Sequence, residues 1–78
     1  MTKILVADPW SDFVEVEMNG ATTIKYASVR AAEACGYDGD DVYWWLADMN
    51  DTFLPEDAII ANYDGQRLVL APRSFEEL

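Results

Sequence analysis

Histidine is absent from this chain of 78 residues, and cysteine occurs once, at Cys35. Without histidine, the chain lacks the usual general base near neutral pH and the commonest metal ligand. A single cysteine cannot form an internal disulfide, which excludes the disulfide framework of small secreted domains. Cys35 ends an alanine-rich helical pattern, where the negative end of the helix dipole disfavours a thiolate. We therefore predict a non-enzymatic protein with no catalytic residue and no cofactor, and a buried, structural Cys35.

Basic residues are also scarce. Five Lys and Arg stand against fifteen Asp and Glu, which gives a formal net charge of −10. This charge repels phosphate backbones and anionic lipid headgroups, so we expect no direct nucleic-acid or membrane partner and favour a protein partner with a basic surface. No apolar run approaches membrane-spanning length, and no basic segment precedes a long apolar stretch. The expected location is the cytoplasm, and the oligomeric state is left open.

The acidic clusters suggest calcium binding at first sight. They are the group Asp38, Asp40 and Asp41 and the group Asp48, Asn50 and Asp51. A calcium loop of the EF-hand type starting at Asp48 would need glycine at Phe53 and a bidentate glutamate at Ile59. Both positions fail, so the clusters are interpreted as solvated turns and no metal site is predicted.

Hydrophobic residues make up 51% of the chain, enough for one compact domain, predicted over residues 1–72 with a frayed tail at 73–78. Alternating and β-branched runs predict strands, an alanine-rich run predicts a helix capped by Thr22 or Thr23, and Pro55 to Asp57 suggests a short second helix. Ile59 and Ile60 are expected to supply core bulk. The predicted strands cover 3–7, 13–18, 42–47, a very short 52–54, and 66–71, and the helix covers 24–35.

This order of elements predicts an α+β fold with a mixed sheet of four to five strands and one helix packed across one face. The most apolar run, VYWWLA at 42–47, is predicted to be the central strand, laid parallel to one strand of the hairpin by a crossover through the helix. On the helix, Ile24, Ala27, Ala31, Ala34 and Cys35 form one candidate buried stripe. Tyr26 and Val29 lie to the other side.

The chain resembles the ubiquitin-like β-grasp family over nearly its full length. The resemblance rests on the order of a hairpin with the acidic strand FVEVE, a helix opened by Thr23 and Ile24, a strand ending at Ala47, and Leu54 with acids behind it. Asp64 and Gly65 then precede LVL at 68–70. Within the family the chain looks most like small bacterial ubiquitin-like proteins, which include those associated with type VII secretion.

One departure bears on function. Ubiquitin and the related sulfur carriers end in Gly-Gly, whereas no glycine follows Gly65 in this sequence. Conjugation or sulfur carriage through the terminus is therefore not expected.

Two adjacent tryptophans point to a binding surface, because neighbours on a strand lie on opposite faces. Alternation with Val42 and Leu46 predicts Trp44 on the helix side and Trp45 on the exposed side. The resemblance implies a hydrophobic patch formed by the first hairpin turn and the outward residues of two strands. The predicted partner-binding residues are Trp10, Tyr43, Trp45 and Val69.

Three classes of function remain open from the sequence. The favoured one is a non-catalytic, non-conjugating protein-interaction module that acts as an adaptor or regulator. The second is an acidic inhibitor or nucleic-acid mimic of the phage type, which blocks a basic groove. The third, implied by the resemblance, is an auxiliary subunit of a multicomponent oxygenase.

Overall fold

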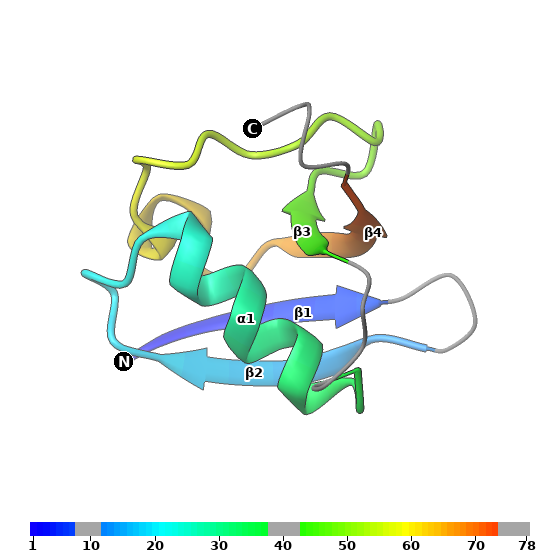
Figure 1. Ribbon diagram of the computed structural model, residues 1–78. Helices are drawn as coiled ribbons and strands as arrows, with labels where there is room; N and C mark the ends of the chain where they lie inside the picture. The colour runs from blue at the N-terminus through cyan, green and yellow to red at the C-terminus, as the bar shows by residue number, and fades with distance from the viewer. Residues whose placement is uncertain (8–11, 38–42, 74–78) are drawn as a thin grey trace.

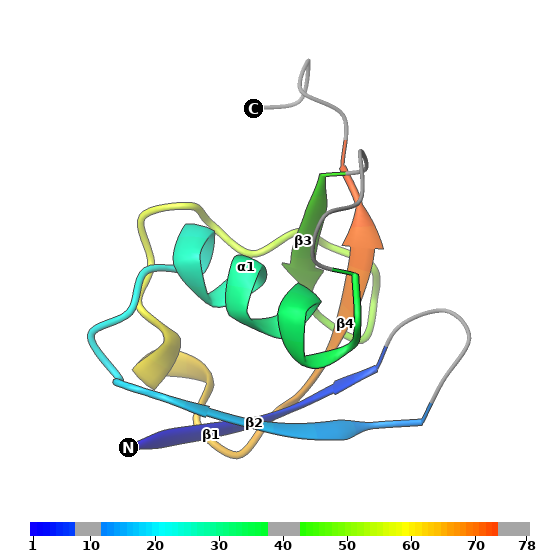
Figure 2. The same ribbon diagram turned by 60° about the horizontal axis from the view of Figure 1, so that its bottom comes forward.

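The computed structural model describes residues 1–7, 12–37 and 43–73, in which one helix lies across one face of a four-stranded sheet. Figure 1 shows the order of the elements, and Figure 2 shows the sheet curving round the helix. The α+β architecture is as predicted, and each strand begins and ends within two residues of its expected bounds. The elements are β1 (Thr2–Ala7), β2 (Val14–Met18), α1 (Ile24–Ala34), β3 (Trp44–Ala47), the 3-10 helix η1 (Ile60–Tyr63) and β4 (Arg67–Pro72).

The strand order is β2-β1-β4-β3, with β1 and β4 as the parallel pair at the centre. The prediction that the VYWWLA run forms the central strand is wrong, because β3 is the edge strand of the four and its neighbour in the sheet is β4, with which it pairs in antiparallel fashion. It is apolar on both faces because another segment covers it. Phe53 forms a bridge with Ala47, and the Leu54 amide donates to the Leu46 carbonyl at 3.0 Å.

The core lies between α1 and the face of the sheet that the helix covers. Alternate residues of all four strands enter it, as period-two alternation requires. Small side chains on the buried face of α1 let the helix approach the sheet closely. The buried apolar residues of this layer include Ile4, Val6, Val16, Met18, Ile24, Ala27, Ala31, Leu46, Ile60, Leu68 and Leu70.

The N-terminus of α1 is held by tertiary contact. Thr23 occupies the cap position, but its side chain makes no capping hydrogen bond, so the predicted threonine cap is not observed. The Ile24 amide donates instead to the Ala58 carbonyl, at 2.9 Å. At the other end, Gly36 has φ of 86°, the left-handed conformation expected after a helix. Ala34, which was placed in the buried stripe, is exposed.

Ser28 joins α1 to β3 through a buried hydrogen bond. Its hydroxyl accepts from the Leu46 amide at 3.0 Å, and its side chain is almost fully buried. Ser28→Ala should therefore leave a buried donor unpaired and lower the free energy of unfolding by about 1–3 kcal/mol. Urea titration of both proteins measures this change. Equal stability of the two would show that the bond contributes nothing net.

The second helical turn lies later than predicted. Residues 55–57 form no helix, and the turn of helix is η1. Two hydrogen bonds fix η1 against the connection before α1: the Ile60 amide donates to the Thr22 carbonyl at 2.8 Å, and the Ala61 amide donates to the Gly20 carbonyl at 3.1 Å. These bonds turn Ile60 into the core and leave Ile59 exposed, so only one of the two isoleucines supplies core bulk.

Candidate functional site

The face of the sheet opposite α1 carries no helix or second sheet among the described residues, and Figure 2 shows the helix on the other side only. We call it the outer face. Alternation places on it the residues that do not enter the core. They are Lys3, Leu5 and Ala7 of β1, Glu15 and Glu17 of β2, Trp45 and Ala47 of β3, and Arg67, Val69 and Ala71 of β4.

Trp45 lies on the outer face, as predicted, but the expectation that it is exposed is wrong. Its side chain is 1% exposed. The Tyr43 ring stacks on it with centroids 5.8 Å apart, and the Arg73 guanidinium lies 4.7 Å from its centroid on a cation-π contact. The indole Nε1 donates to the Leu54 carbonyl at 2.9 Å. The strand register was therefore correct, and the ring is contacted by Tyr43 of its own segment, by Leu54 in the loop after β3 and by Arg73 after β4.

Arg73 completes a cluster with Tyr43, Trp45 and Phe53, which we call the aromatic cluster. Its guanidinium also lies 5.1 Å from the Phe53 ring centroid, and its amide donates to the Tyr43 carbonyl at 2.7 Å. Arg73 was expected to begin a frayed tail, whereas these contacts fix it to β3. The aromatic cluster therefore forms a fixed border along the β3 edge of the outer face.

Trp44 faces the core side of the sheet, as predicted, although it is only half-buried. Its ring stacks on Tyr37, with centroids 4.7 Å apart and an interplanar angle of 25°. Leu46 is the residue of β3 that is fully buried on this side, next to α1. Of the two tryptophans, the one assigned to the surface is thus the better buried.

Of the other predicted site residues, two lie in the described part of the chain and one does not. Tyr43 and Val69 are half-buried, and Val69 pairs with Ala47 on the outer face, next to the aromatic cluster. Trp10 lies outside the described residues. Leu5, which was not predicted, is also half-buried on this face; its signal was the alternation of β1 with Ile4 and Val6, both of which are buried.

Charge on the outer face is concentrated at its β2 edge. The Lys3 ammonium lies 3.2 Å from a Glu15 carboxylate oxygen and 4.0 Å from one of Glu17. The hydrogen bond with Glu15 raises the pKa of Lys3, as do the charges of both glutamates. The outer face therefore passes from acidic at β2, through β1 and β4, which carry Leu5, Val69 and Ala71 beside the basic Lys3 and Arg67, to aromatic at β3.

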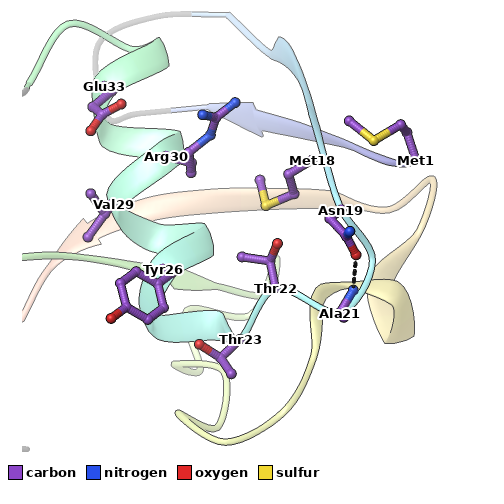
Figure 3. A pocket seen from close by; sticks show the side chains of 10 residues that line it. All are labelled: Met1, Met18, Asn19, Ala21, Thr22, Thr23, Tyr26, Val29, Arg30 and Glu33. Carbon is purple, nitrogen blue, oxygen red and sulfur yellow. Dashed lines mark hydrogen bonds between the residues drawn. The ribbon is translucent and has the colours of Figure 1, made fainter.

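A second surface lies where the outward side of α1 meets β2, and no role was predicted for it. Tyr26 and Val29 of the helix are 66% and 50% exposed. They border a groove of about 750 Å³ that runs over Arg30 to Met18 and the turn after β2. In Figure 3, Arg30 and Met18 project into the space between helix and strand, and the Ala21 amide donates to the Asn19 side chain at 2.9 Å.

Cys35 and the acidic clusters were the residues considered for catalysis and for metal binding, and their surroundings fit structural roles. Cys35 is half-buried, rather than buried as predicted. The Asp48 carboxylate accepts hydrogen bonds from the amides of Asn50 and Thr52 at 2.8 and 3.0 Å, as in a capped turn. Asp38, Asp40 and Asp41 lie outside the described residues. Within residues 1–7, 12–37 and 43–73, no three acidic or cysteine side chains gather as a metal site would need, and no helix could span a membrane.

Comparison with known proteins supports the fold. No protein-family model and no curated protein matches the sequence. Among solved structures, the chain is similar to the EccD5 ubiquitin-like domain from Mycobacterium xenopi, with a TM-score of 0.62 and 16% sequence identity over 94% of each chain. At that identity the likeness is one of fold. The predicted ubiquitin-like β-grasp is thereby confirmed.

Proposed function

We propose that this chain is a non-catalytic, non-conjugating protein-interaction module, an adaptor or regulator, that binds a protein partner through its outer face. The observation that supports the proposal is a sheet face that no helix or second sheet of the described residues covers, and whose two central strands carry a group of apolar side chains. Leu5, Val69 and Ala71 lie there half-buried, with the aromatic cluster beside them. A rigid apolar centre with a polar border is the usual anatomy of a protein-binding patch.

The residues of this face would have different roles. Val69 and Tyr43 would contact the partner, because both keep part of their side chain exposed. Trp45 would act from beneath, by holding Tyr43 and Arg73 in place. Trp10 is part of the proposal on the sequence pattern alone.

The structural match is to a ubiquitin-like domain of EccD5, a domain within a larger named protein. It supports a protein-interaction role, in keeping with the type VII secretion proteins among the bacterial relatives that the sequence resembles. The net charge of −10 favours a partner with a basic surface.

Val69→Glu should weaken partner binding by about 2 kcal/mol or more, roughly thirtyfold in affinity, because it puts an unpaired charge at the centre of the patch. Affinity capture from the native host, with wild type and variant as baits, identifies the partner. Titration of the purified partner then measures the loss.

Val29→Glu is the matched control. It makes the same chemical change at an exposed valine on the outward side of α1, away from the outer face. The partner should bind this variant as it binds wild type. A partner lost with Val29→Glu and retained with Val69→Glu would refute the outer face as the binding surface.

A further inference from the structure

The outward side of α1 carries two exposed apolar side chains between two charges of opposite sign. Tyr26 is 66% and Val29 is 50% exposed. Lys25 and Glu33 are exposed as well, and each lies four residues from Val29, so the three follow one another along the helix at steps of about 6 Å. In Figure 3, Tyr26, Val29 and Glu33 project from one side of the helix, and Arg30 projects from the other. We call Lys25, Tyr26, Val29 and Glu33 the α1 stripe, which is basic at one end, apolar in the middle and acidic at the other end.

The two charges of the α1 stripe are placed unfavourably for the helix dipole. Lys25 lies in the first turn, at the positive end, and Glu33 lies in the last turn, at the negative end. The first turn holds no acidic residue and the last turn holds no basic one. The ion pairs within the described part of the chain are both made by Lys3, so neither Lys25 nor Glu33 has one there. Within a single copy, the arrangement is therefore unfavourable at both ends of the helix.

A second helix of the same sequence, laid antiparallel to the first, would correct both ends at once. With Val29 at the twofold axis, Lys25 of each copy comes level with Glu33 of the other, because both are four residues from Val29. Each lysine then meets a carboxylate and the negative end of the neighbouring helix, and each glutamate meets an ammonium and the positive end. The exposed Tyr26 and Val29 of both copies are covered in the same contact.

The local charge of α1 favours contact between copies at this helix. Its charged residues are two basic and one acidic, Lys25, Arg30 and Glu33, so the helix has a net charge of +1 in a chain with a net charge of −10. Two copies in contact therefore repel one another least where they meet through α1. A second copy is also the occupant that the charges select, because the α1 stripe is its own complement when reversed.

We propose that α1 is a self-association surface, through which two copies of the chain form an antiparallel, twofold-symmetric dimer with Lys25 of each copy on Glu33 of the other. One helix of 11 residues makes the contact, so the interface lies below the usual size for a stable dimer. We expect a weak dimer, with a Kd on the order of 100 μM. At the lower concentrations used to capture a partner the chain is a monomer, so this proposal and the one for the outer face are tested separately.

Sedimentation velocity of the wild-type chain from about 10 μM to about 1 mM should show a monomer that converts into a dimer. The measurement is made at physiological salt, which screens the repulsion between two acidic copies beyond about 8 Å. On dilution, the amide shifts of the 15N-labelled chain should change along residues 25–33 and stay constant on the outer face. A chain that remains a monomer at about 1 mM, or shifts centred on the outer face, would overturn the proposal.

Lys25→Glu and Glu33→Lys test the pairing itself. Each variant replaces two favourable contacts of the dimer by two repulsive ones, so each should associate at least about tenfold more weakly than wild type. Thermal melts should show both variants folded, because both side chains are exposed and each new charge suits its end of the helix dipole. Glu15→Lys is the matched control, since it makes the same change at an exposed glutamate of the outer face and should associate as wild type does.

Mixing the two single variants gives the sharpest result. One variant then carries two glutamates in its α1 stripe and the other two lysines, so a heterodimer should form at concentrations at which either variant alone is a monomer. The double variant K25E/E33K exchanges the two residues, keeps the net charge of −10 and should regain wild-type association. General attraction produces neither result, because all of these chains are strongly acidic. Single variants that associate like wild type, or a mixture that stays monomeric, would overturn the proposal.

Discussion

Trp45→Ala should lower the free energy of unfolding by about 3–5 kcal/mol, the largest loss expected from a single truncation in this chain. The side chain is fully buried, and its removal opens a cavity between Tyr43 and Arg73. It also leaves the buried Leu54 carbonyl without the indole donor. Since domains of this size are stable by only several kcal/mol, a large share of the protein should unfold at room temperature.

Trp44→Ala is the natural control for this prediction. The Trp44 ring is half-buried and stacks on Tyr37, so its removal should cost about 1–2 kcal/mol. Trp45→Phe keeps most of the bulk and loses the hydrogen bond to Leu54, so it should fall between the two. Thermal melts and urea titrations rank the three variants. A greater loss for Trp44→Ala than for Trp45→Ala would contradict the covering of Trp45.

Ile60→Ala should lower the free energy of unfolding by about 2–5 kcal/mol, because it truncates a fully buried side chain. Ile60 lies in η1 at 0% exposure, while its neighbour Ile59 is 39% exposed. Ile59→Ala should therefore change stability by only about 0.5 kcal/mol.

Urea titration of the two alanine variants checks this difference. Equal losses would mean that η1 is not fixed by the Ile60 and Ala61 amides as described. The far-ultraviolet circular dichroism of both variants should match that of wild type, because neither change removes a backbone hydrogen bond.

The strands and the helix could be predicted because local patterns determine them. The alternation of FVEVEM indicates a strand with one solvent-exposed face and one buried face. The alanine-rich run before Gly36 indicates a helix that packs closely on a sheet. The order of these elements then led to the β-grasp. Each of these signals lies within a short window of sequence.

The burial of Trp45 could not be predicted from alternation, because Phe53 and Arg73, which complete the cluster around it with Tyr43, come from other segments of the chain. Phe53 lies in the loop after β3, and Arg73 follows β4. The central place given to the VYWWLA run failed for the same reason. Burial on both faces is typical of a central strand, but here α1 covers one face and the aromatic cluster the other face of a strand at the edge.

The candidate sites show the same difference between features set by local sequence and features set by the whole fold. Val69 and Tyr43 were identified from alternation and lie on the outer face. The groove beside α1 was missed because Tyr26 and Val29 were noted only as lying off the buried stripe. These two side chains border a groove only because β2 lies next to α1 at the edge of the sheet, and the strand order that puts it there is a property of the whole sheet.

The central claim is that a protein partner binds the outer face. The most direct measurement is a titration of the 15N-labelled chain with the partner recovered by wild type and lost with Val69→Glu. We expect amide shifts centred on Leu5, Val69 and Ala71, with those of Tyr26 and Val29 unchanged. Shifts centred on the helix, with the outer face silent, would contradict the claim.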